Sequence, residues 1–239
     1  MRIVILLLLI STSTFGQFRV KGDSLIYANG TGDTVRINQT NQQIKQMFND
    51  NVVSYKALGS AIVAQTVDFP LQYCNVASGL TDAQIRFTAV QLPVSTTITG
   101  VKVYVRTQGA YTGDNNNMVG LYAYAAATGT LTLVASSTNT AALWTAAANA
   151  VLSIPFSSTY AATSGVYYVG IIYNNSAQTT APALASGTAL NNAAMAGTAF
   201  GFSNSAKLYG SVNTQTSLPN TIAMSSVTAS TAPLWVALY

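Results

Sequence analysis

The side chains that most enzymes use for acid–base and nucleophilic chemistry are almost absent from this chain. The 239-residue sequence contains no histidine, and its six acidic residues are all aspartate. A glycoside hydrolase needs two carboxyl groups on either side of a sugar bond, and only Asp68, Asp82 and Asp114 lie in the region with strand patterns. Without histidine there is no Ser-His or Cys-His pair and no imidazole ligand for zinc. The sequence therefore predicts a protein that is not an enzyme and holds no cofactor.

Two further features have the side chains for chemistry, and each has a simpler structural interpretation. Cys74 is the only cysteine, so it cannot form an internal disulfide, and we expect a half-buried apolar side chain. Asp114–Asn117 offers oxygen ligands in a loop, but one carboxylate is poor charge for calcium, which takes about six to eight oxygens. Asparagine also tolerates left-handed turns. We expect a turn there and no metal site.

Charge is scarce and unevenly distributed. Charged residues make up 7% of the chain, and beyond Asp114 the only charged side chain is Lys207. The net charge of +4 comes from single, scattered cations, which disfavours nucleic acid as a partner. Hydroxyl and amide groups must solvate the second half, and such a surface has weak electrostatic protection against self-association. We therefore expect a homo-oligomer.

Tyrosine is the most abundant side chain suited to ligand recognition, with 13 tyrosines against two tryptophans. Several tyrosines alternate with aliphatic residues, so we expect them on the outer faces of strands, with one tryptophan in a loop between strands. Aromatic rings beside amides and hydroxyls can bind a glycan or form a protein contact surface. The alternative is that a second layer or a subunit covers this face. The ligand-contact candidates are Tyr104, Tyr122, Tyr124, Trp144, Tyr167 and Tyr173.

The amino terminus has the pattern of a secretory signal. Arg2 precedes the apolar run Ile3–Ile10, and small polar residues follow, with a cleavage point expected just before Gln17. The run is too short to span a bilayer, which needs roughly 20 apolar residues. Residues 1–17 are therefore expected to be a signal peptide or a short apolar anchor, and the protein is expected outside the cytoplasm.

Two short segments follow the signal. Residues 18–37 predict a β-hairpin, because Ser24–Ala28 and Thr34–Ile37 flank a loop with two glycines. Residues 38–65 predict one helix, which begins with a capping box at Thr40.

The expected helix has apolar residues at heptad-like spacing, with Asn51 between Phe48 and Tyr55 at a position where the pattern would place an apolar residue. This pattern is typical of a coiled-coil stem, in which a polar core residue fixes the oligomeric state. An amphipathic helix that lies on its own domain gives the same pattern over so few heptads. For the stem we expect a trimer. The oligomerisation candidates are Ile44, Phe48, Asn51, Tyr55, Leu58 and Ile62.

From residue 66 to residue 239 the hydrophobic pattern has a period of two. Val101, Val103 and Val105 alternate with polar and aromatic residues, and similar short segments recur with Gly, Asn, Ser and Thr between them. This pattern predicts an all-β fold: a jelly-roll-like antiparallel β-sandwich, preceded by the short β-hairpin and the helix. The other expected strands are 83–92, 119–124, 130–135, 150–156, 166–173, 199–202, 206–212 and 234–239.

Three stretches of this region share a set of motifs: a threonine-rich strand entry, a loop followed by Val-Gly-Leu-Tyr, and a glycine-led buried strand. They are Gln91–Lys102, Asp114–Tyr122 and Gly165–Asn174. In these motifs the region resembles the β-sandwich domains of bacteriophage and prophage tail-fibre and spike proteins. Secreted carbohydrate-binding jelly rolls are a related group with the same order of motifs. The likeness spans residues 81–176, and its motifs are structural.

The resemblance implies a virion surface structural protein, a spike or fibre head whose sandwich contacts a host receptor or glycan. Its expected partners are further copies of the chain, other virion or surface proteins, and a cell-surface glycan. The alternative is a secreted bacterial adhesin or carbohydrate-binding module, which the signal pattern favours.

Overall fold

The structure is a computed structural model that describes residues 17–21, 24–28, 34–38, 61–66, 74–187, 207–230 and 232–239. The chain divides into two compact units, Met1–Val52 and Val53–Tyr239. Within the described ranges, the structure contains no helix with the length and apolar character that crossing a membrane requires.

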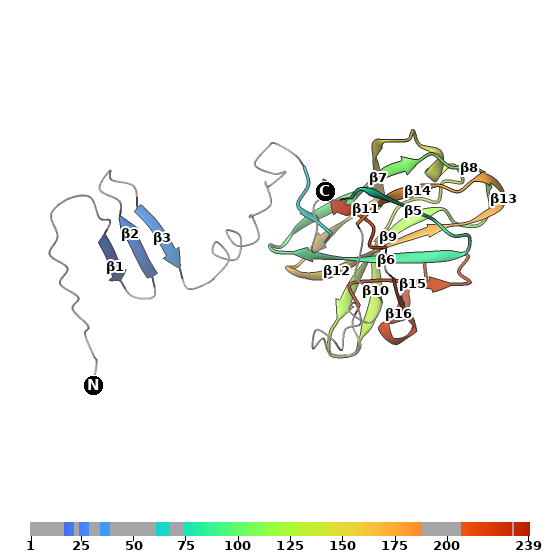
Figure 1. The fold of residues 1–239 in the computed structure, drawn as a ribbon. Helices are drawn as coiled ribbons and strands as arrows, with labels where there is room; N and C mark the ends of the chain where they lie inside the picture. Colours follow the sequence, from blue (N-terminus) through green and yellow to red (C-terminus); the bar gives the residue numbers. More distant parts are fainter. Residues whose placement is uncertain are drawn as a thin grey trace. The chain divides into compact units, whose positions relative to one another are not determined.

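The first unit contains a three-stranded antiparallel sheet in the order β1-β2-β3 (Figure 1). Its strands are β1 (Gln17–Lys21), β2 (Ser24–Ala28) and β3 (Thr34–Asn38). The pairing of β2 with β3 confirms the predicted hairpin. The additional strand β1 pairs along the whole of β2, and a third strand matters because an isolated hairpin is only marginally stable in water.

The predicted helix lies mostly outside the described residues, but its carboxyl end is described and is not helical. Ala64–Gln65 form strand β4, which pairs with β18 (Val236–Leu238). The hydroxyl of Thr66 accepts a hydrogen bond from the amide of Val236 at 2.7 Å. The prediction of helix up to residue 65 is therefore wrong at this end, because pairing with a distant strand overrides the local helical pattern. Of the oligomerisation candidates, Ile62 is described and packs against an apolar cluster; the others lie outside the described residues: Ile44, Phe48, Asn51, Tyr55 and Leu58.

Two large antiparallel sheets and one smaller two-stranded sheet make up the described part of the second unit, which confirms the all-β, sandwich-type prediction (Figure 1). The seven-stranded sheet has the order β16-β10-β9-β12-β6-β15-β17. Its strands are β6 (Gln84–Leu92), β9 (Met118–Ala125), β10 (Thr130–Ser136), β12 (Gly165–Tyr173), β15 (Tyr209–Asn213), β16 (Thr221–Ala223) and β17 (Thr228–Ala229).

The six-stranded sheet has the order β4-β18-β7-β14-β5, and β11 pairs with the other edge of β7. Its remaining strands are β5 (Val76–Gly79), β7 (Thr96–Thr107), β11 (Ala150–Ala162) and β14 (Ala183–Ser186). A separate pair joins β8 (Ala110–Gly113) and β13 (Asn175–Thr180). Two short 3-10 helices complete the described elements, η2 (Leu143–Thr145) and η5 (Met224–Ser226).

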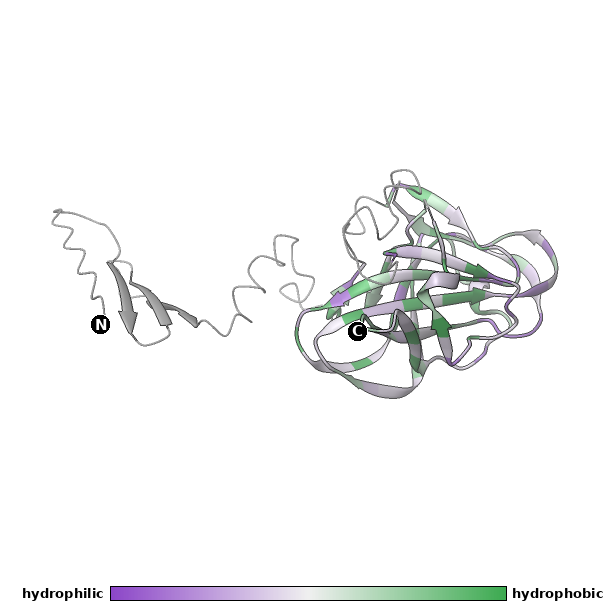
Figure 2. Ribbon diagram, turned by 90° about the horizontal axis from the view of Figure 1, so that it is seen from below, coloured by the Kyte–Doolittle hydropathy of each residue, from purple (hydrophilic) through white to green (hydrophobic). Residues whose placement is uncertain are grey.

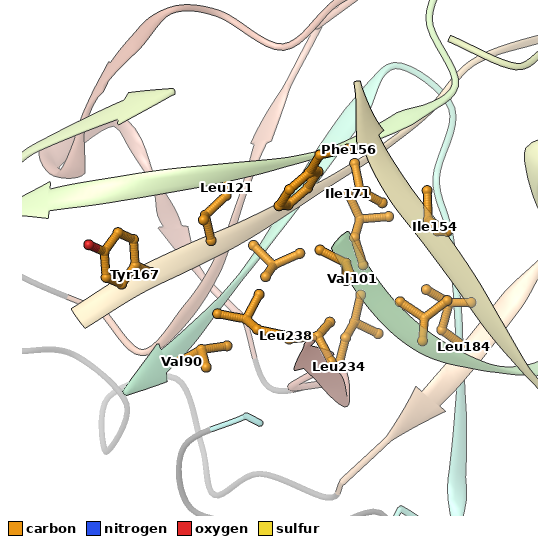
Figure 3. Close-up of a cluster of buried hydrophobic side chains, with 14 of the residues drawn as sticks. Val90, Val101, Leu121, Ile154, Phe156, Tyr167, Ile171, Leu184, Leu234 and Leu238 are labelled. Carbon is orange, nitrogen blue, oxygen red and sulfur yellow. The ribbon is translucent and has the colours of Figure 1, made fainter. Parts of the chain in front are cut away.

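The main core fills the space between the two sheets. Figure 3 shows its side chains converging from strands of both sheets, among them Val101 of β7, Leu121 of β9 and Ile171 of β12. All three are almost completely inaccessible to solvent. Burial of each such side chain stabilises the fold by about 1.5–3 kcal/mol. Figure 2 shows the resulting pattern, in which hydrophobic and hydrophilic residues alternate along the strands.

A second apolar cluster covers the outer face of the seven-stranded sheet. Phe87, Tyr122 and Tyr168 of this face pack against the segment 214–227. This segment contains the edge strand β16, and the residues on either side of β16 contribute Leu218 and Met224 to the cluster. The backbone holds this covering segment in place, because the amide of Leu133 donates to the carbonyl of Asn220 and that of Met224 to the carbonyl of Gly129. Both faces of the central strands β6, β9 and β12 are therefore largely buried.

Candidate functional site

Two of the tyrosines predicted on an outer face lie in the main core instead. Tyr167 and Tyr173 share the inner face of β12 with Val169, and both are buried (Figure 3 for Tyr167). Their hydroxyls donate within the protein, to the carbonyl of Thr163 at 3.0 Å and to the side-chain amide oxygen of Gln178 at 2.8 Å. The outer-face prediction is wrong here because both faces of β12 are apolar, so a period of two cannot separate inside from outside.

Tyr122 and Trp144 are also fully buried, for different reasons. Tyr122 does lie on the outer face of its sheet, but the covering segment seals it, and its hydroxyl donates to the carbonyl of Pro219 at 3.0 Å. Trp144 lies in η2, between strands as predicted, but its indole Nε1–H points inward and donates to the carbonyl of Ile172 at 3.0 Å. The expected exposure of these two rings is wrong.

Two ligand-contact candidates remain partly exposed. Tyr124 lies near the end of β9, with its ring edge-on to Tyr168 at 5.7 Å between centroids. Tyr104 lies on the outer face of β7 in the other sheet and packs against a small cluster that includes Cys74 and Trp235. Of these two, Tyr104 has charged neighbours on its own strand.

Three side chains of β7 form a row on the outer face of the six-stranded sheet. Val101, Val103 and Val105 fill the core, so the alternating residues Lys102, Tyr104 and Arg106 must face outward. All three are partly exposed. Tyr239 extends the row, because its ring lies over Gly100. The approach is so close that a Cβ atom added at Gly100 would lie 2.6 Å from the hydroxyl of Tyr239. We call the surface of Lys102, Tyr104, Arg106 and Tyr239, flanked by Val151 and Ser153 of β11, the β7 strip.

The Lys102 ammonium is held in a fixed place on this strip. Its Nζ donates to the hydroxyl of Ser153 at 2.7 Å and lies 4.6 Å from the centre of the Tyr239 ring. Tyr239 is itself fixed by its backbone, whose carbonyl accepts from the amide and the hydroxyl of Thr99 at 2.6 and 2.9 Å. An ammonium beside an aromatic ring is favoured by the ring's negative face.

The other end of the strip combines an aromatic ring with a guanidinium. Tyr104 lies directly opposite Val151, which is 50% exposed. Arg106 follows on the same face. Burial raises the pKa of the Cys74 thiol to about 12, and the positive charge of Arg106 offsets part of this effect. Cys74 is thus an inert thiol beside the strip and no nucleophile.

Among the described residues, no aspartate side chain neutralises the positive charge of the strip. Within the described residues, neither Lys102 nor Arg106 forms an ion pair. The described acids lie elsewhere: Asp82 accepts from the amide of Asn175 at 2.9 Å, and both Asp82 and Asp114 raise the pKa of Tyr173.

The loop from Asp114 to Asn117 has the predicted structural role. Asn115 takes a left-handed conformation with φ of 43°, and the Asn117 side chain is fully buried. Across the described part of the chain, no three His, Cys, Asp or Glu side chains come together in a way that could hold a metal ion.

A second cation, Arg86 of β6, is buried and cannot meet a ligand at the surface. Its guanidinium donates to the hydroxyls of Ser78 and Ser230, each at 3.3 Å, and to the carbonyl of Ala232. Burial lowers its pKa. Arg86 therefore connects β6 to β5 and to the carboxyl-terminal segment.

Sequence reasoning found Tyr104 and missed its charged neighbours. The period of two that placed Tyr104 outward also applies to Lys102 and Arg106, so the signal was present. Tyr239 had no such signal, because its place depends on close approach to Gly100 across the sheet.

The fold and the strip together define an all-β, sandwich-type protein with a cationic and aromatic surface on one sheet. No family model matches the chain, and no curated protein matches it.

Proposed function

We propose that this chain is a non-enzymatic surface protein whose β-sandwich binds a glycan through the β7 strip. The observation on which the proposal rests is the partly exposed ring of Tyr104 between two cations, Lys102 and Arg106. A ring of this kind offers a flat apolar face to a sugar, and the cations and the hydroxyl of Ser153 offer hydrogen bonds to its polar groups. The absence of histidine and glutamate from the sequence supports binding without catalysis.

The setting we propose is a virion, with the sandwich as the head of a spike or fibre. The motifs in residues 81–176 support this setting, as does the charge-poor surface of the second half. The segment 18–64, up to the start of strand β4, is then the attachment and trimerisation stem. Light scattering of the exported protein tests the stem: a trimer supports it, and a monomer at micromolar concentration contradicts it.

A secreted adhesin or carbohydrate-binding module is the second candidate. The charged start and apolar run of residues 2–10 favour it, because they match a secretory signal. The position of the gene separates the two: capsid and replication genes beside it support the virion setting, and bacterial surface-protein genes support the adhesin.

Glycan-array binding tests the site with a matched pair of variants. Tyr104→Ala and Tyr124→Ala each remove a partly exposed tyrosine, but from different sheets. We expect Tyr104→Ala to lose about tenfold or more in affinity, which corresponds to about 1.4 kcal/mol, and Tyr124→Ala to bind as the wild type does. The reverse result would place the site on the other sheet.

A further inference from the structure

We infer that the glycan is acidic, with carboxylate groups that pair with Lys102 and Arg106 on either side of a sugar ring stacked on Tyr104. This inference rests on the proposed function and adds the chemical class of the ligand.

The first argument is the unbalanced charge of the strip. Lys102 and Arg106 share one face of one strand, and within the described residues no carboxylate pairs with either. Two other cations of the second unit are engaged elsewhere: Arg86 is buried, and Lys207 donates to the carbonyl of Met224 at 2.9 Å. Two like charges held near each other raise the local positive potential and attract an anion.

The second argument is the unused hydrogen-bonding capacity of the two cations. An ammonium has three N–H donors, and on Lys102 the hydroxyl of Ser153 takes one of them. The Arg106 guanidinium has no hydrogen-bond acceptor among the described residues. Its planar fork of N–H groups matches the two oxygens of a carboxylate. Arg106 can therefore bind an anionic group without losing an existing hydrogen bond. Lys102 can bind one with its two remaining N–H donors.

The third argument is the spacing. Residues 102 and 106 are four apart on an extended strand, so their Cα atoms are about 13 Å apart, with Tyr104 midway. A single small anion reaches only one of the cations. A polymer with repeated carboxylates and a ring between them meets all three side chains at once, which favours an acidic polysaccharide over a free acid.

Other acidic macromolecules fit the strip less well. Nucleic acid binding depends on many phosphate contacts, and two cations supply few. A stable protein interface has an apolar centre surrounded by a polar rim. The strip has too little apolar surface for such a centre, because Val151 is its exposed large apolar side chain and the neighbouring Ser153 is polar.

The experiment compares acidic oligosaccharides with their neutral methyl esters. The full-length exported protein is titrated calorimetrically with oligogalacturonate, oligomannuronate and a sialylated oligosaccharide, each also in its methyl-esterified form. We expect at least one acid to bind at least tenfold more tightly than its ester, and its affinity to fall as salt rises.

Charge variants assign the preference to the two cations. Lys102→Gln and Arg106→Gln should each cost about tenfold in affinity for the acid and leave affinity for the ester unchanged. Lys102→Arg and Arg106→Lys keep the charge and should keep at least part of the affinity. Unchanged melting temperatures establish that each variant is folded.

The outcomes separate this inference from the proposed function. If Tyr104→Ala abolishes binding but acid and ester bind equally, the ligand is a neutral glycan, and the inference is overturned while the proposed function stands. If no glycan binds, both are overturned. Equal binding of a single-stranded polynucleotide would also overturn the inference, because it would show a general attraction for polyanions.

Discussion

Asn117 and Asn174 hydrogen-bond to each other in both directions. The side-chain Nδ2 of Asn117 donates to the carbonyl of Asn174 at 2.9 Å, and the amide of Asn174 donates to Oδ1 of Asn117 at 3.0 Å. Asn117 is fully buried, and its own amide donates to the side chain of Asn139 at 2.8 Å. One asparagine thereby joins the loops that follow β8, β10 and β12.

Asn117→Ala is expected to lower the free energy of unfolding by about 2–4 kcal/mol. The substitution leaves the buried amide of Asn174 without its partner and its carbonyl with only the longer bond from the amide of Asp114, at 3.4 Å. Each buried polar group that loses its partner costs about 1–3 kcal/mol. Urea denaturation measures the change. Asn116→Ala is the matched control, because its side chain is partly exposed, and it should change stability by no more than about 0.5 kcal/mol. Equal effects of the two substitutions would contradict the role given to Asn117.

The buried tyrosines predict a loss of stability at alkaline pH. Burial raises the pKa of Tyr122 and Tyr168, and it raises that of Tyr173 to about 12, against an ordinary value near 10. Below about pH 10 both the folded and unfolded states keep the phenol proton, so stability is unaffected. Above it the unfolded state loses the proton first, and each such tyrosine should cost about 1.4 kcal/mol per pH unit until the folded pKa is reached.

Absorbance and circular dichroism followed together test this alkaline transition. Phenolate absorbance from the buried tyrosines should appear together with the loss of β-structure. Tyr173→Phe should make the decline between about pH 10 and 12 shallower, since one tyrosine no longer titrates there. Full tyrosine ionisation in a protein that stays folded would contradict the burial described here.

Arg86 predicts a difference between two substitutions at one site. Its buried guanidinium has hydroxyl and carbonyl acceptors but no ion pair among the described residues. An apolar side chain of similar length avoids the cost of desolvating a charge, so Arg86→Met should stay within about 1 kcal/mol of the wild type. Arg86→Ala leaves a cavity and should cost about 2–4 kcal/mol. Thermal unfolding of both variants measures these changes in stability. Equal losses of stability in Arg86→Met and Arg86→Ala would contradict the prediction.

Strands in which apolar and polar residues alternate strictly were predictable from the sequence, and strands without this alternation were not. Val101, Val103 and Val105 placed β7 and its inner face correctly, because one face of that sheet is apolar and the other is mixed. Strands β13 and β14 lack such a signal: Asn175–Thr180 is almost wholly polar, and Ala183–Ser186 is short and made mainly of small residues. Their pairing depends on partners far away in the chain.

The candidate site was predicted in part for a related reason. The alternation of apolar and polar residues predicts which side chains share a face of a strand, but it does not predict which other segments cover that face. Tyr122 lies outward as expected, and the segment 214–227, distant in sequence, seals it. Tyr104 escapes such a cover and remains partly exposed. The difference between these two tyrosines is therefore set by tertiary structure.

Lysine acylation in the presence and absence of a bound acidic oligosaccharide measures whether the glycan lies on the β7 strip. Lys102 lies on the β7 strip. Lys207 serves as the internal control, because its own carbonyl accepts a hydrogen bond from the hydroxyl of Tyr168 on the other sheet. Mass spectrometry measures the labelling rate of each. We expect saturating ligand to slow labelling of Lys102 several-fold and to leave labelling of Lys207 unchanged. Unchanged labelling of Lys102 at saturation would contradict this expectation.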